Sequence, residues 1–165
     1  MSLNLRGITG AYNGLASKIK FIKECYMKSL KDPRVRRFAE EAAGKGAREE
    51  QVANLFKGLK KVMVYLPDPV GVEYTKSPSA MLDQWSSSPN HTISGDCDDM
   101  SCMAFSMLKS IGIPAALRVT WFGPGRQPKH IYVIAKLPSG DIAFDLASKR
   151  PFGFEHPFTR KMDFL

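Results

Sequence analysis

The chain has 165 residues, of which 44% are hydrophobic, and its formal net charge at pH 7 is +8. This length and apolar content are typical of one globular domain with its own core. No run approaches the roughly 18 consecutive apolar residues of a membrane span, and the N-terminus lacks the apolar block of a secretory signal. These features exclude an integral membrane protein and predict a cytoplasmic one.

The three cysteines, Cys25, Cys97 and Cys102, indicate a reducing compartment. Their number is odd, and none of their spacings matches a zinc-binding CxxC pair. Cys97 and Cys102 lie five residues apart on one predicted helix, which directs them to different faces. A disulfide framework is therefore not expected, and at least one thiol is left for chemistry.

The positive charge is concentrated in the first part of the chain. Residues 1–64 hold 14 Lys and Arg against 6 Asp and Glu, whereas residues 65–165 hold 10 of each kind. Such a basic part can dock an anionic partner, such as nucleic acid, an acidic protein or a cell-wall polymer, although basic side chains on helix surfaces are more often simply solvated. We expect a single domain, 1–165, with a basic helical part over 1–64 and a core over 65–165.

Three amphipathic helices are predicted in the basic part. Apolar residues recur every three to four positions over 15–30. Asp32 and Pro33 provide an N-cap and a first-turn proline for a second helix, which ends near Ala43. The third helix, over 47–63, has the clearest apolar stripe, formed by Val52, Leu55, Phe56, Leu59, Val62 and Met63.

The chain changes character at Leu66. Four prolines and a run of serines lie between residues 67 and 95, and the segment shows little periodicity. Prolines at its start prevent the helix from continuing. We predict a long ordered loop over 67–95, and such loops in compact domains often shape a binding site.

A helix followed by an antiparallel sheet is predicted for the rest of the chain. From Asp96 the apolar positions follow helical spacing as far as Ile111, and Gly112 ends the helix. Strands are expected over 115–122, 130–137 and 142–147, the last two joined by a hairpin-like turn. The sequence therefore predicts an α+β fold in which this helix packs on an antiparallel sheet and other helices precede it.

Cys97 is the candidate nucleophile. It lies in the run GDCDD (95–99), where the pattern places the first turn of a helix. A thiol reacts as its thiolate, and the free N–H groups and positive dipole end of a first turn favour that anion. Cys25 and Cys102 lie deeper in their helices and are interpreted as buried core residues. The aspartates beside Cys97 raise the pKa expected for its thiol, so the chemistry needs a base.

The acidic cluster around Cys97 does not match a calcium loop. An EF-hand loop needs glycine at its sixth position and an acid at its twelfth, and counted from Asp96 these positions hold Ser101 and Met107. Helix capping is the role expected of Asp96, Asp98 and Asp99. We predict neither a metal nor another cofactor.

His130 is the candidate base, and Asp145 is the candidate acid that orients it. The base must meet the thiol in space without being near it in sequence. His91 lies in the predicted loop and His156 in a solvated C-terminal stretch, whereas His130 opens a strand. Asp145 lies on the next predicted strand, where pairing can bring it beside His130. The competitor, Asp141, has a Ser-Gly-Asp setting that is typical of a turn.

This ordered set of residues resembles the transglutaminase-like superfamily. The resemblance covers residues 62–147: GDCDD at the start of an amphipathic helix, Gly-Ile-Pro at its end, His130 opening one strand and Asp145 in the next. The segment YLPDPVGVEYTKSP (65–78) is similar to the stretch upstream of GDCDD in bacterial and phage members, and for a phage-encoded chain this resemblance implies the virion as the alternative location. The superfamily has a papain-like fold and includes transglutaminases, cysteine peptidases and peptide N-glycanases. The resemblance implies that Cys97 is the nucleophile, His130 the base and Asp145 its orienting acid.

Family members often have an aromatic residue two positions after the histidine and Asp-Pro at the acid. Tyr132 keeps the first feature, but Leu146 follows Asp145. The resemblance also implies an oxyanion hole that pairs the backbone N–H of the nucleophile with a second donor from upstream. The candidates in that region are Gln84, Trp85 and Asn90, with core packing as the alternative for Trp85.

The expected function is acyl transfer at an amide through a thioester on Cys97. Water as the acceptor gives a peptidase or amidase, and an amine gives a transglutaminase that crosslinks proteins. The residues do not decide between the two, while the size and the bacterial or phage-like character favour hydrolysis of a protein or peptide substrate. The competing class is a non-catalytic assembly or binding module that docks through the basic helices. An intact Cys, His and Asp set argues against that class.

Overall fold

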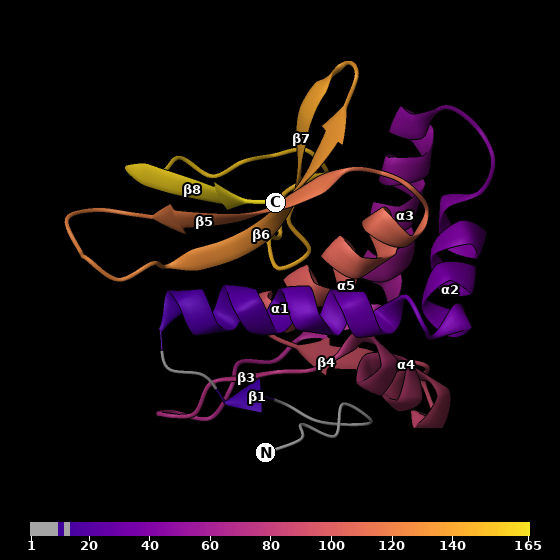
Figure 1. Ribbon diagram of the computed structural model, residues 1–165, viewed down its shortest axis with the longest axis horizontal. Helices are drawn as coiled ribbons and strands as arrows, with labels where there is room; N and C mark the ends of the chain where they lie inside the picture. Colours follow the sequence, from indigo (N-terminus) through magenta and orange to yellow (C-terminus); the bar gives the residue numbers. More distant parts are fainter. Residues whose placement is uncertain (1–9, 12–13) are drawn as a thin grey trace.

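Helix α5 (Cys97–Ser110) lies at the centre of the fold (Figure 1). The structure is a computed structural model that describes residues 10, 11 and 14–165. A four-stranded antiparallel sheet packs on one side of α5, and α4 (Pro78–Ser87) lies on another. The helix is buried from Asp98 to Leu108. This arrangement confirms the predicted α+β fold, in which helices precede a helix packed on an antiparallel sheet.

The three predicted N-terminal helices are confirmed. They are α1 (Leu15–Ser29), α2 (Pro33–Ala43) and α3 (Arg48–Val62). The carboxylate of Asp32 accepts a hydrogen bond from the Arg34 backbone N–H at 3.0 Å and so caps α2. Helices α1 and α2 pack against α5. Among the described residues, no helix has both the length and the apolar content needed to cross a bilayer.

The prediction of a long loop over 67–95 was wrong. The segment contains α4 and two short strands, β3 (Tyr74–Thr75) and β4 (Ile93–Gly95). Helix α4 begins because Ser77 Oγ accepts a hydrogen bond from a backbone N–H in the first turn and Pro78 occupies the first helical position. Strand β4 pairs in parallel with β2 (Met63–Tyr65), and β3 pairs with β1 (Gly10–Ala11).

The main sheet has the strand order β7-β6-β5-β8. Strands β5 (Ala115–Trp121) and β6 (His130–Leu137) agree with their predictions. The third strand was predicted over 142–147, but β7 spans Gly140–Phe144, so Asp145 follows the strand instead of lying in it. The sequence analysis missed β8 (Arg160–Phe164), which pairs with β5 at the edge of the sheet.

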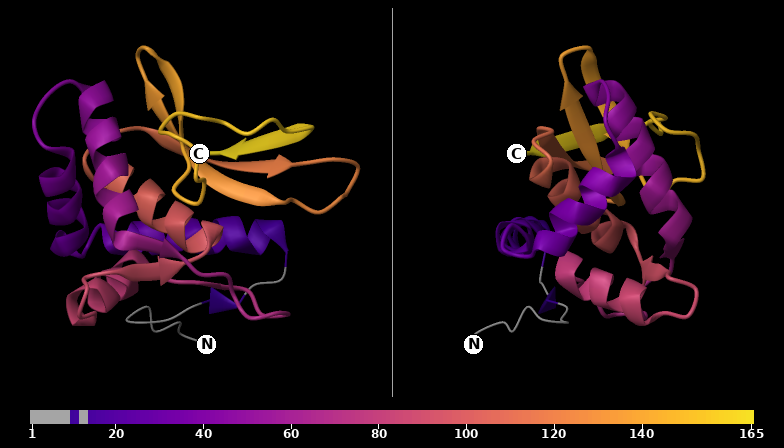
Figure 2. Two further views of the ribbon diagram at one scale, coloured as in Figure 1. Left: turned by 180° about the vertical axis from the view of Figure 1, so that it is seen from behind. Right: turned by 90° about the vertical axis from the view of Figure 1, so that its right-hand side faces the viewer.

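Three segments that are distant in the sequence meet at one end of the molecule. They are the start of α1, the connection between β2 and β3, and the β5–β6 loop (Figures 1 and 2). At the same end, the Ser101 hydroxyl of α5 donates a hydrogen bond to the Ile131 carbonyl of β6 at 3.1 Å. This bond fixes the start of β6, and with it His130, against the first turns of α5.

Candidate active site

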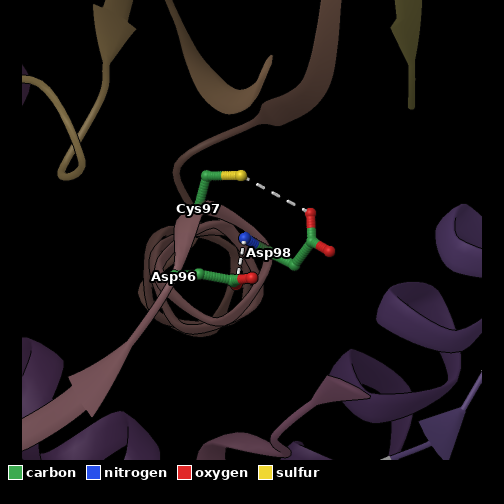
Figure 3. A group of neighbouring side chains, drawn as sticks. All are labelled: Asp96, Cys97 and Asp98. Atoms are coloured by element: carbon green, nitrogen blue, oxygen red, sulfur yellow. Dashed lines mark hydrogen bonds between the residues drawn. The ribbon is translucent and has the colours of Figure 1, made fainter. Parts of the chain in front are cut away.

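A tight turn between β4 and α5 makes Cys97 the first residue of the helix. Asp96 Oδ1 accepts a hydrogen bond from the backbone N–H group of Asp98 at 2.9 Å (Figure 3). It accepts a second one from the N–H group of Asp99 at 3.3 Å. In return Asp99 Oδ2 accepts one from the Asp96 N–H at 3.2 Å, which completes a capping box. Gly95 lets the chain approach this box, because a Cβ there would lie 2.5 Å from the Asp99 side chain.

The surroundings of Cys97 favour the protonated thiol. Its Sγ lies 3.7 Å from Asp98 Oδ1, to which the thiol donates (Figure 3). Burial, followed by the negative charges of Asp98 and Asp96, raises the pKa of the Cys97 thiol, whereas a hydrogen bond with the Ile131 backbone and the charge of Lys18 lower it. The raising effects dominate, as the sequence analysis expected of the aspartates. The thiol therefore needs a base that removes its proton.

His130 and Asp145 form a hydrogen-bonded pair, with His130 Nε2 lying 2.7 Å from Asp145 Oδ2. The second oxygen of Asp145 accepts hydrogen bonds from the backbone N–H groups of Ala147, at 3.1 Å, and Ser148, at 3.2 Å. The carboxylate is thus oriented by its own downstream backbone. Because Nε2 faces Asp145, Nδ1 is the ring nitrogen that can take a proton from a thiol. The His130 ring also stacks on Tyr132, with ring centroids 5.3 Å apart.

Cys97 and His130 line the same small cavity, of about 150 Å³. Ile131, the residue that follows His130, lines the cavity as well. The structure thus brings the three residues singled out in the sequence to one place, with Asp145 behind His130. Their catalytic roles stay predictions, since geometry alone does not test them.

The three oxyanion candidates lie elsewhere, because none lines the cavity that Cys97 and His130 share. The Gln84 amide binds Ser94 with both its ends, at 2.8 Å and 3.3 Å. The Trp85 ring packs edge-on against Phe38, with centroids 5.5 Å apart, and Asn90 is exposed. The second oxyanion donor stays a prediction. The Cys97 backbone N–H is available as the first donor, since a first-turn N–H has no acceptor within its helix.

The other titratable residues weighed in the sequence have separate partners. His91 Nδ1 lies 3.1 Å from the Trp85 carbonyl, and Asp141 pairs with a lysine at the surface. His156 is exposed, as its C-terminal setting predicted. Its Nε2 lies 3.1 Å from Ser148 Oγ, and it lines a second cavity, of about 380 Å³, together with His130 and Asp145.

The sequence analysis missed two lysines that support the site. Lys18 of α1 pairs with Asp98 at 2.7 Å and with Glu73 at 3.1 Å. Lys60 of α3 donates to the carbonyls of Leu146, at 3.0 Å, and Ser148, at 2.9 Å, which flank the turn after Asp145. Each lies on the polar side of an amphipathic helix, where nothing local distinguishes it from neighbouring lysines.

Asp96, Cys97 and Asp98 place possible metal-ligand atoms within 4.8 Å of one another (Figure 3). Their oxygens already have partners, because Asp96 caps the helix and Asp98 pairs with Lys18. The group therefore fits the capping and thiol environment described above better than a cation site.

No family model matches the chain, and no curated protein matches it significantly. Solved structures are similar in fold. A candidate protease from Parabacteroides distasonis has a TM-score of 0.54 at 14% identity, over 82% of this chain and 26% of the other. A candidate cysteine protease from Cytophaga hutchinsonii has a TM-score of 0.53 at 16% identity, over 82% of this chain and 43% of the other.

A structure of a TGase is less similar, with a TM-score of 0.45 at 13% identity, over 89% of this chain and 36% of the other. The chain spans less than half the length of each of these proteins. At such identities the likeness concerns the fold alone. The chain therefore shares its α+β fold with a candidate protease and a candidate cysteine protease.

Proposed function

We propose that the protein is a cysteine-dependent acyltransferase that hydrolyses amide bonds in a protein or peptide substrate. The observation that carries the proposal is the hydrogen bond of 2.7 Å between His130 and Asp145, on a ring that lines the same cavity as Cys97. The fold shared with a candidate cysteine protease supports the same class of chemistry.

In the proposed reaction, His130 Nδ1 takes the proton of the Cys97 thiol as the sulfur attacks the carbonyl carbon of the amide. The C–N bond then breaks, and His130 returns the proton to the leaving amine, which leaves a thioester on Cys97. Water attacks the thioester, releases the carboxylic acid and restores the thiol. The Cys97 backbone N–H donates to the developing oxyanion.

The electrostatics of the cavity favour proton transfer during attack over a preformed thiolate. Burial, Asp98 and Asp96 raise the pKa of Cys97, so the resting thiol holds its proton at neutral pH. Asp145 stabilises the imidazolium that forms when His130 accepts this proton. The role proposed for Asp145 is therefore to orient the ring and to balance its charge.

Alkylation of Cys97 by iodoacetamide at pH 7, followed by mass spectrometry of the modified peptide, tests the proposal. Cys25 and Cys102 are fully buried, so labelling of the native protein reports on Cys97. His130→Ala is expected to slow labelling roughly tenfold or more, because it removes the base. Asp145→Asn is expected to slow it less, because the ring stays but loses its partner.

His91→Ala is the matched control, since this histidine lies at the Trp85 carbonyl and outside the Cys97 cavity. Its labelling rate should equal that of the unmodified protein. Equal rates in the His130→Ala and His91→Ala proteins would contradict the proposal.

Incubation with a pool of peptides and a fluorescent primary amine distinguishes the acyl acceptors. Cleaved or deamidated peptides indicate water as the acceptor, as we propose. Incorporation of the amine in place of hydrolysis would instead assign the thioester to a transglutaminase reaction.

A further inference from the structure

A large cavity, of about 940 Å³, opens beside the candidate nucleophile. It is bounded by the start of α1, the connection between β2 and β3 and the β5–β6 loop, which meet at one end of the molecule (Figures 1 and 2). It adjoins the small Cys97 cavity, because both are lined by Leu15, Lys18, Glu73, Asp96 and Pro128. We call this larger cavity the entry groove, since a substrate can reach the thiol through it.

The charges along this path are mainly negative. Asp68, Glu73 and Asp96 line the entry groove, and Asp98 lines the adjoining Cys97 cavity. Among the described lining residues, the ammonium groups are Lys18, in the entry groove, and Lys129, in the Cys97 cavity. Four carboxyl groups, of which Asp96 is only partly ionised at neutral pH, thus line this path with two ammonium groups, in a chain whose net charge is +8. The local field therefore opposes the field of the whole protein.

The pKa of Asp96 is raised mainly by burial and in second place by neighbouring carboxyl groups. Burial, followed by the charges of Asp98 and Asp99, raises the pKa of Asp96 to about 7. A cation bound in the entry groove would relieve this repulsion and favour the carboxylate form. Lys18 offsets part of the charge, but it is already engaged with Asp98 and Glu73.

Beside these charges the entry groove is lined by the apolar residues Leu15, Pro69, Val70, Val72 and Pro128 and by the amide of Gln127. An apolar wall next to carboxylates matches a side chain with a hydrocarbon stem and a cationic head. A peptide side chain of this kind is Lys or Arg.

We infer that the entry groove binds a Lys or Arg side chain of the substrate peptide, close to the amide that Cys97 attacks. This inference rests on the proposed function, because it assigns a substrate class to the same site. Acidic peptides are disfavoured there by the same carboxylates.

The charge preference can be measured at Cys97 without a known substrate. Two methanethiosulfonate reagents of similar size are compared, the cationic aminoethyl and the anionic sulfonatoethyl compound, each of which forms a mixed disulfide with the thiolate. Both need the same thiolate, so the ratio of their rates cancels the effect of the thiol pKa. Divided by the same ratio for 2-mercaptoethanol, the Cys97 value is expected to favour the cation about tenfold at low salt.

Variants of the carboxyl groups test whether the preference for the cationic reagent arises in the entry groove. Glu73→Gln and Asp68→Asn should each reduce the ratio about threefold, and added salt should reduce it in the unmodified protein. Glu40→Gln is the matched control, because Glu40 is an exposed glutamate of α2 that pairs with Arg36. It changes the net charge equally and should leave the ratio unchanged. A ratio that favours the anion, or one that Glu73→Gln and Glu40→Gln change equally, would overturn the inference.

A protection experiment adds a peptide probe. Acetyl-trilysine amide should slow iodoacetamide labelling of Cys97, whereas acetyl-triglutamate amide should not. Equal protection by the two peptides, or none from trilysine, would count against the inference. These readouts stay separate from the proposed function, since they compare charges at one thiol, whereas the function depends on the loss of reactivity in His130→Ala.

Discussion

The Lys18 ammonium lies 2.7 Å from a carboxylate oxygen of Asp98, the residue that follows the candidate nucleophile. The two side chains are only 18% and 3% exposed. This pair brings α1 into the wall of the Cys97 cavity, where Leu15 also lies. The basic N-terminal part therefore contributes directly to the site and is more than a module attached to a separate core.

Replacement of Lys18 should slow the reaction of Cys97. Lys18 lowers the pKa of the thiol and balances Asp98, so Lys18→Met is expected to reduce iodoacetamide labelling several-fold at pH 7. The unpaired buried carboxylate should also lower the free energy of unfolding, by about 3 kcal/mol. Labelling rates and urea denaturation measure the two effects.

Asp98→Asn should have the opposite effect on labelling, because it removes a negative charge 3.7 Å from the sulfur. The double variant Lys18→Met/Asp98→Asn should recover most of the unfolding free energy that Lys18→Met loses. Lys20→Met is the control, since Lys20 lies on the same helix and is 77% exposed. A loss of stability in Lys20→Met as large as in Lys18→Met would contradict the assignment.

The stability of the protein should fall as the pH rises from about 4 to about 8. In the folded state burial and Asp98 raise the pKa of Asp96 from 3.8 to about 7. The folded protein therefore binds more protons than the unfolded chain in this window, and deprotonation favours unfolding. One unit of pKa shift corresponds to about 1.4 kcal/mol, so the expected loss is a few kcal/mol.

Asp96→Asn isolates this effect, because asparagine also caps helices and does not titrate. Urea denaturation at several pH values should give a flatter dependence for the variant. Burial likewise raises the pKa of Asp99, to about 6, so part of the slope remains. If the two proteins show the same slope between pH 4 and 8, the raised pKa of Asp96 is refuted.

Lys60 is expected to act as a positioning residue for Asp145. Its ammonium holds the carbonyls of Leu146 and Ser148, so Lys60→Met should loosen the turn that orients the carboxylate. Labelling of Cys97 at pH 7 should slow, by less than in His130→Ala. Lys57→Met, on an exposed position of the same helix, is the control. Adding Lys60→Met to Asp145→Asn should slow the labelling of Cys97 little further. If the effects of the two substitutions on the labelling rate were fully additive, Lys60 would act independently of Asp145.

Arg118 should anchor the last strand of the sheet. It is 6% exposed and binds Asp163 of β8, at 2.6 and 2.7 Å, and Glu155, at 2.7 Å. Arg118→Met is expected to cost about 3 kcal/mol of unfolding free energy, measured by urea denaturation. The surface pair of Lys136 and Asp141 offers the comparison, where Lys136→Met should cost less than about 1 kcal/mol. Similar losses in both variants would refute the anchoring role.

The sequence predicted the elements whose signals are local. Helices α2 and α5 have an N-cap aspartate and an apolar stripe, and both begin where predicted. Helix α4 has a similar start signal at Ser77 and Pro78. It was not predicted, because the other prolines of the segment indicated a loop. Strand β8 could not be found in this way, because it pairs with the distant strand β5 and its Asp163 binds Arg118, 45 residues earlier in the chain.

The candidate site likewise contains residues that the sequence predicted and residues that it could not predict. The sequence predicted Cys97, His130 and Asp145 as site residues because few residue types can act as nucleophile, base and orienting acid. Lys60 lies 86 residues before Leu146, and Lys18 lies far from Asp98 in the chain, so only the folded structure reveals their contacts. The charge of the entry groove could not be predicted for the same reason, since its carboxyl groups come from separate segments.

The turn before α5 is built from Gly95, Asp96 and Asp99, and no bond of its capping box involves the Cys97 side chain. The scaffold that presents the thiol is therefore independent of the thiol itself. A Cys97→Ser protein should keep its helix start and its entry groove while losing the sulfur. Such a protein can serve as bait that retains a bound peptide without consuming it, and so allow the natural substrate to be isolated.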